Sequence, residues 1–117
     1  MRAPAVFALL MLTATVPAQV AAQGGCAAAG NRVFARKADL PAGAAAALGF
    51  NMAERGQPFQ ATDDIAPGPR LPGSRFIAAR QQGCRLAIRY ERGGIAHTYN
   101  SAVLERRGNR WVVLRRD

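Results

Sequence analysis

The chain has 117 residues and a formal charge of +9, because its 16 Lys and Arg side chains outnumber its seven Asp and Glu side chains. A chain of this length can form one domain at most. Hydrophobic residues make up 50% of the chain, which excludes a disordered tail. Two cysteines and one histidine are too few for a zinc site closed within one chain. No glycine pattern marks a phosphate-binding loop, and we therefore expect no metal and no cofactor.

Residues 1–22 have the layout of a secretory signal peptide. A single positive charge precedes an apolar stretch from Ala5 to about Val16. This stretch is shorter than the roughly 20 residues that a membrane-spanning helix needs. Small residues up to Ala22 suit cleavage after that position. The sequence therefore predicts a periplasmic or secreted protein that keeps no stable membrane span once the signal is removed.

Export changes the interpretation of the two cysteines. Cys26 and Cys84 remain after cleavage, and a pair of cysteines in an oxidising compartment predicts a disulfide. The bond would close a loop of 57 intervening residues and would stabilise the fold by about 4 kcal/mol on the chain-entropy model. Lipidation of Cys26 and a pair of buried thiols are the alternatives.

A helix is predicted near the start of the domain. Residues 23–40 form an N-terminal segment with a short candidate strand at 32–36, and a single small domain is expected over 41–117. Helical spacing over 41–55 relates four apolar side chains, namely Ala44, Ala47, Leu48 and Met52. Internal glycines weaken this helix, and a break near Gly49 is an open alternative.

Strand patterns follow a loop over 57–73 that is rich in proline and glycine. From Ser74 onward the hydrophobic pattern has period two. Turn residues separate four strand-like runs, at 74–81, 84–91, 95–105 and 110–116. We expect an α+β fold in which one N-terminal helix packs on a four-stranded antiparallel meander.

Alternation along the strands predicts which side chains share a face, provided that all three turns have an even number of residues. The face expected beneath the helix is mostly apolar: Ile77, Ala79, Leu86, Ile88, Tyr90, Ile95, His97, Tyr99, Val103, Val112 and Leu114. The opposite face would then carry Phe76, Arg80, Arg85, Arg89, Thr98, Asn100, Leu104, Trp111, Val113 and Arg115. One face is thus predicted to be a cationic surface with two aromatic side chains.

The excess charge belongs to the sheet half of the chain. Residues 23–69 carry four basic and four acidic side chains, whereas residues 70–117 carry eleven arginines and three acids. Guanidinium groups match the geometry of carboxylates and phosphates. The expected ligand-binding residues are Arg80, Arg85, Arg89, Trp111 and Arg115, with the indole as a contact platform.

The partner expected for this face is an acidic envelope component or an acidic protein. Export and the small number of aromatic residues argue against nucleic acid, which basic patches bind with several stacking rings. A face that is merely solvated, with charge for solubility, is the alternative.

Two other functions remain open in the sequence. A small hydrolase would use His97 with Asp63 or Asp64, and a protein-inhibitor module would use the loop over 64–73. We expect no catalytic residue, because alternation places His97 in the core and adjacent carboxylates in a loop more often cap a turn.

Overall fold

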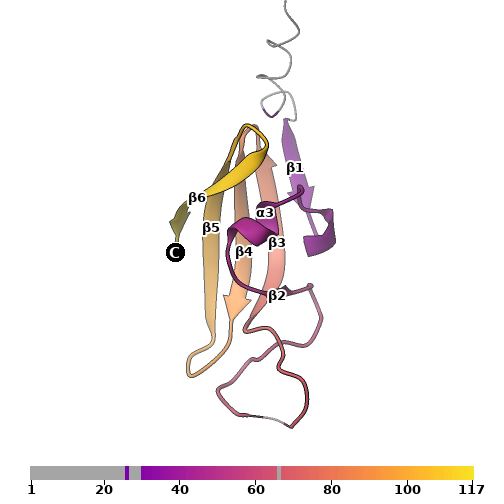
Figure 1. The fold of residues 1–117 in the computed structure, drawn as a ribbon, viewed down its shortest axis with the longest axis vertical. Helices are drawn as coiled ribbons and strands as arrows, with labels where there is room; N and C mark the ends of the chain where they lie inside the picture. The colour runs from indigo at the N-terminus through magenta and orange to yellow at the C-terminus, as the bar shows by residue number, and fades with distance from the viewer. Residues whose placement is uncertain (1–25, 27–29, 66) are drawn as a thin grey trace, which may run out of the picture.

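The computed structural model describes Cys26, residues 30–65 and residues 67–117. These residues form a mostly β protein, in which one short helix lies against a single sheet (Figure 1). The expected signal peptide over 1–22 lies outside them. Among the helices of the described ranges, none combines the length and hydropathy that crossing a membrane would require.

The four C-terminal strands form the antiparallel meander that the alternation predicts. They are β3 (Ser74–Gln82), β4 (Arg85–Arg92), β5 (Thr98–Arg107) and β6 (Arg110–Arg116). Two shorter strands complete the sheet, β1 (Asn31–Phe34) and β2 (Met52–Ala53). β1 pairs antiparallel with β3, on the side of β3 that does not pair with β4. β2 pairs parallel with the start of β3. The strand order is β1-β3-β4-β5-β6, so β1 and β6 are the edges.

The helix is much shorter than the sequence predicts. α3 spans only Ala44–Ala47, so the prediction of a helix over 41–55 is wrong. Gly43 and Gly49 adopt φ values of 82° and 80°, and this left-handed conformation ends the helix on both sides. The chain then becomes extended as β2, while a 3-10 turn, η1 (Lys37–Asp39), precedes the helix.

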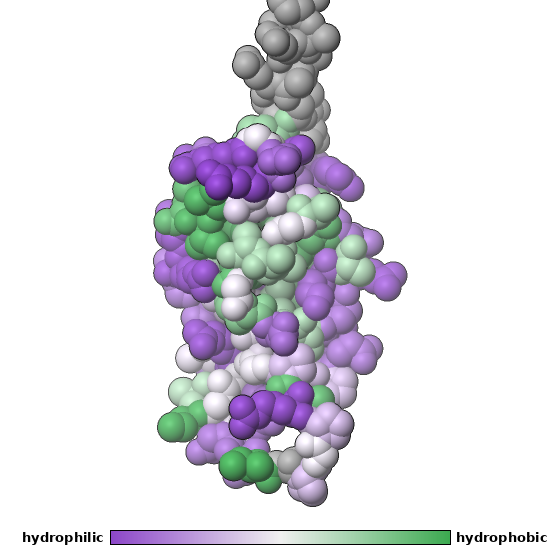
Figure 2. Space-filling model, in the orientation of Figure 1, coloured by the Kyte–Doolittle hydropathy of each residue, from purple (hydrophilic) through white to green (hydrophobic). Residues whose placement is uncertain are grey.

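The short helix still covers one side of the sheet, next to β6 (Figure 1). We call this side the inner face and the opposite side the outer face. Figure 2 views the inner face, where a weakly hydrophobic patch lies over α3 and hydrophilic side chains surround it. The buried core between helix and sheet consists of Phe34, Ala44, Leu48, Met52, Phe76, Ala79, Leu86, Ile88, Tyr90, Ala102, Leu104 and Trp111.

The predicted sorting of side chains holds on β4 and fails on β5 and β6. Arg92 pairs with Thr98, so five residues connect β4 to β5 and the assumption of an even turn is wrong there. Because side chains alternate with period two, one extra residue exchanges the faces of the whole following strand. The faces of β6 are exchanged together with those of β5, because the turn between the paired Arg107 and Arg110 has two residues, an even number.

The exchange overturns most of the predicted positions in this half of the sheet. Six residues expected beneath the helix lie elsewhere. Ile95 and His97 are exposed in the connection, Leu114 is exposed in β6, and Tyr99, Val103 and Val112 lie at outer positions. Five residues expected on the cationic face lie at inner positions instead, namely Thr98, Asn100, Leu104, Trp111 and Val113.

Two β-bulges shift the pattern locally. The first, between Phe76 and Ala78, turns Phe76 onto the inner face, where its side chain is buried rather than outward as predicted. The second lies where β5 pairs with β6, and it lets Arg115 pair with Val103. A bulge inserts one extra residue and so restores the original alternation beyond it. Arg115 therefore lies at an outer position, as expected.

The loop over 57–73 begins by crossing the end of the sheet. The backbone amide of Gln60 donates to the Pro72 carbonyl at 2.8 Å, and the backbone amide of Gly94 donates to the Ala61 carbonyl at 3.4 Å. A Cβ atom at Gly93 would overlap the backbone of Gln60 and Ala61, so a glycine is needed at this crossing. The crossing brings Phe59 onto the outer face, where it is buried.

A disulfide joins Cys26 to Cys84, as the sequence predicts, with 4.8 Å between the two Cα atoms. It ties the N-terminal segment to the turn between β3 and β4. Because Cys26 forms this bond, its sulfur does not carry the lipid of the alternative interpretation. A structural disulfide points to an oxidising compartment outside the cytoplasm.

Replacing both cysteines, as Cys26→Ala with Cys84→Ala, should lower the free energy of unfolding by about 4 kcal/mol, because the unfolded chain regains the entropy of an open loop. Urea unfolding followed by circular dichroism measures this. Wild-type protein kept under reducing conditions serves as the control and should show the same loss. A loss below about 1 kcal/mol in both cases would contradict a stabilising role for the bond.

Glu54 anchors η1 to β2. Its carboxylate accepts hydrogen bonds from the backbone amides of Lys37 at 2.6 Å, Ala38 at 3.0 Å and Arg55 at 2.9 Å. Burial by itself would raise the pKa of Glu54, but these hydrogen bonds and the charge of Arg36 outweigh it and hold the pKa below its ordinary value of 4.5.

A lowered pKa in the folded state makes Glu54 a pH-dependent source of stability. Its contribution is present above the ordinary value of 4.5 and is lost as the pH falls through the folded pKa. The stability difference between wild type and Glu54→Gln should therefore be largest at neutral pH and shrink in acid. Urea midpoints across this range measure the difference, with Asp63→Asn, at an exposed loop residue, as control. A difference that stays constant with pH would contradict this role.

Candidate binding face

Four of the five predicted ligand-binding residues lie together on the outer face. Arg80 comes from β3, Arg85 and Arg89 from β4, and Arg115 from β6, and all four are exposed. Arg80 pairs with the β4 residue that separates Arg85 from Arg89. With usual strand spacings, these positions span about 14 Å across the sheet and about 13 Å along β4. We call these four residues the arginine patch.

No carboxylate of the described residues forms an ion pair with the arginine patch. Three acids lie on the outer side: two are paired with other cations, and the third, Asp117, accepts a hydrogen bond from Ser101 at 3.2 Å. Glu105 pairs with Arg107 at 3.1 Å, and Glu91 pairs with Arg75. No ion pair of the described chain involves a member of the patch, so the charge of all four guanidinium groups faces solvent.

Trp111 is not part of this surface, and its predicted position beside the arginines is wrong. Its side chain is only 8% exposed and belongs to the core beneath α3. Tyr99 and His97, which the sequence places in the core, lie exposed on the outer side instead. Their rings are stacked with 5.2 Å between centroids, and Tyr99 is 68% exposed. The aromatic surface near the arginine patch is therefore this pair rather than the indole.

A buried carboxylate organises the end of the outer face next to Tyr99. Glu91 follows Arg85 and Arg89 on the same side of β4, yet it is only 6% exposed. Its Oε1 forms an ion pair with Arg75, whose guanidinium lies 4.3 Å from the centre of the Phe59 ring. Its Oε2 lies 3.9 Å from His97 Nε2. These contacts neutralise Glu91 locally, so it does not offset the arginine patch.

Sequence reasoning missed this cluster because it depends on the chain crossing. Phe59 belongs to a loop 16 residues before Arg75 in the chain, and only the folded structure brings it over the sheet. One signal was available in the pattern. Glu91 is the single acid among the outward side chains of β4, and it pairs with Arg75 across the strands.

The residues of the alternative functions are placed differently from expectation. The carboxylate near His97 is that of Glu91, whereas Asp63 and Asp64 are exposed in the loop. The backbone amide of Asp64 donates to Thr62 Oγ1 at 3.3 Å, so the threonine hydroxyl, rather than a carboxylate as expected, forms the local turn. Within the described ranges, no group of three or more His, Cys, Asp or Glu side chains is arranged to hold a metal ion.

No protein-family model, curated protein or solved structure matches this chain. Function is therefore inferred from the placement and charge of its own residues.

The exchange of faces predicts opposite outcomes for two aromatic substitutions. Trp111→Ala should lower the free energy of unfolding by about 3 kcal/mol, because it opens a cavity in the core. Tyr99→Ala should change it by no more than about 0.5 kcal/mol, because the exposed ring makes few packing contacts. Urea unfolding followed by circular dichroism measures both. The reverse ranking would contradict the observed register of β5 and β6.

Proposed function

We propose that the protein is an exported, non-enzymatic binding protein that holds an acidic partner on its outer face. Its charge comes from Arg80, Arg85, Arg89 and Arg115. The observation that carries the proposal is the imbalance of this face. Of the three acids on this side, Glu91 and Glu105 are paired with other cations and Asp117 contacts Ser101, while no member of the arginine patch forms an ion pair in the described chain.

Physical chemistry favours an anionic partner for such a surface. Each guanidinium group presents several N–H donors in a plane that fits a carboxylate or phosphate, and these charge-assisted hydrogen bonds are the stronger kind. The strands hold the arginine backbones at fixed spacings, so little backbone entropy is lost on binding. An anion placed among four like charges also relieves their mutual repulsion.

The stacked His97 and Tyr99 rings supply the contact platform of this face. Aromatic side chains bury much area at a small cost in conformational entropy, which makes them frequent anchors of binding surfaces. The ion pair of Glu91 with Arg75 supports the platform from below, since His97 lies against the same carboxylate. The partner would contact charge at one end of the face and rings at the other.

The proposed compartment is the periplasm or the cell exterior. The disulfide supports an oxidising environment, and the N-terminal pattern over 1–22 supports export. Acidic envelope components and acidic proteins are both present there, and the proposal includes either as the partner.

Two probes with different chemistry test the proposal, namely vesicles that contain phosphatidylglycerol and the polymer poly-L-glutamate. The wild-type protein should bind at least one of them, and affinity should fall steeply as added salt screens the exposed charges. Reversing two charges, as Arg85→Glu with Arg89→Glu, should weaken binding at least about tenfold with an unchanged melting temperature.

A matched control separates this site from total charge. The variant Arg32→Glu with Arg106→Glu changes the net charge by the same amount at two exposed residues whose strand positions face away from the outer face. It should weaken binding much less than the patch variant. Equal losses in the two variants, affinity that ignores salt, or no binding to either probe at low ionic strength would overturn the proposal.

A further inference from the structure

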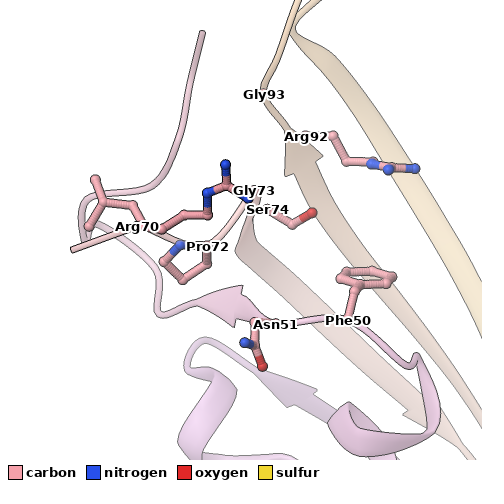
Figure 3. Close-up of a pocket in the computed structure, with 9 residues that line it drawn as sticks. Phe50, Asn51, Arg70, Pro72, Gly73, Ser74, Arg92 and Gly93 are labelled. Carbon is pink, nitrogen blue, oxygen red and sulfur yellow. The ribbon is translucent and has the colours of Figure 1, made fainter. Parts of the chain in front are cut away.

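A groove opens on the inner face, on the side of the sheet opposite to the arginine patch. It has a volume of about 540 Å³, which is within the range of small-molecule sites. Its walls come from the chain after α3, from the end of the long loop and from the adjoining ends of β3 and β4 (Figure 3). The residues that the argument uses are Phe50, Arg70, Ser74, Arg92 and Gly93.

The charged side chains of the groove are both cations. Arg70 belongs to the loop and Arg92 to the end of β4, and neither forms an ion pair with a described residue. Arg92 pairs with Ser74 across the strands, and the Gly93 amide donates to the Gly73 carbonyl at 3.0 Å, which holds this end of the hairpin together. In the view of Figure 3, the Ser74 hydroxyl lies between the two arginines.

An aromatic ring forms the apolar part of the groove. Phe50 packs against Tyr90 with 5.2 Å between ring centroids. The guanidinium of Arg116 lies 5.9 Å from the centre of the Phe50 ring and donates a hydrogen bond to the Leu48 carbonyl at 2.8 Å. These neighbours fix the position of the ring, so the groove offers a preformed flat surface beside two cations.

We infer that this groove binds a small ligand that carries a carboxylate or phosphate group on a flat apolar body. The anionic group would accept hydrogen bonds from Arg70 and Arg92, with the Ser74 hydroxyl as a further donor. The apolar body would lie against Phe50, away from the guanidinium groups. This site is separate from the arginine patch and does not depend on the function proposed for the outer face.

The chemistry of the lining favours an anion over other classes of ligand. A metal cation would meet two positive charges and no lining carboxylate. A neutral ligand without acceptors would displace water from both guanidinium groups without replacing their hydrogen bonds, which costs free energy, and neutral acceptors form weaker hydrogen bonds to them than anions do. An anion avoids both penalties, because it replaces hydration with charge-assisted contacts.

Phenyl phosphate, benzoate and benzyl alcohol are suitable probes, because they share a phenyl ring and differ in charge and anionic group. Titration of the oxidised protein, followed by ¹⁵N–¹H NMR, should give saturable shifts at the amides of Ser74 and Gly93 for at least one of the two anions. Benzyl alcohol should give none. Whichever anion binds more tightly identifies the preferred group.

Two exposed arginines provide the matched variants. Arg92→Gln removes the inward guanidinium and should weaken the anion about tenfold, the effect of losing roughly 1.4 kcal/mol of interaction. Arg110→Gln removes a guanidinium at the start of β6, outside both the groove and the arginine patch, with the same change in net charge, and should leave the affinity unchanged. The NMR spectra report directly whether each variant is folded.

Three results would overturn the inference. They are the absence of saturable shifts with either anion up to about 10 mM, equal weakening by Arg110→Gln and Arg92→Gln, and binding of benzyl alcohol as tight as that of the anions. Failure of this site would leave the outer-face proposal intact, because the two are tested with different probes and different variants.

Discussion

The five-residue connection between β4 and β5 is the constraint on which both faces of the sheet depend. Arg92 pairs with Thr98, and this pairing decides which side chains of β5, and of β6 up to its bulge, face the helix. Because side chains alternate along a strand, one residue more or less would exchange the two faces of β5 and, through the short turn that follows, of β6. The same connection therefore buries Trp111 and exposes Tyr99.

Arg85 and Arg89 face away from the helix because the core covers the opposite side of β4. The inner side of β4 carries Leu86, Ile88 and Tyr90, which pack beneath the helix. Its arginines at alternate positions must then face solvent, since an unpaired charge in the core would be very costly. Glu91 is the exception that supports this explanation, because it is buried on the outer side only together with the Arg75 guanidinium.

The two proposed sites use opposite sides of one strand. Arg89 points outward with the arginine patch, whereas Arg92 lines the groove on the inner side. Since their positions differ by an odd number of residues, the pleat alone separates them. Each site combines unpaired guanidinium groups with an aromatic surface, Tyr99 with His97 outside and Phe50 inside. The two proposed anion-binding surfaces therefore share no side chain.

Period-two alternation determined the meander, and the prolines and glycines determined the long loop, because both patterns act on neighbouring residues. The disulfide followed from the presence of two cysteines in a chain with an export signal pattern. The positions of Arg80, Arg85 and Arg89 also followed from the sequence, since no odd turn intervenes between them. Tertiary structure decided the rest. The length of the β4–β5 connection, the two bulges and the left-handed Gly43 and Gly49 depend on how strands and helix pack together. The environment of Glu91 and the inner groove arise only when distant segments meet, and no local pattern records that meeting.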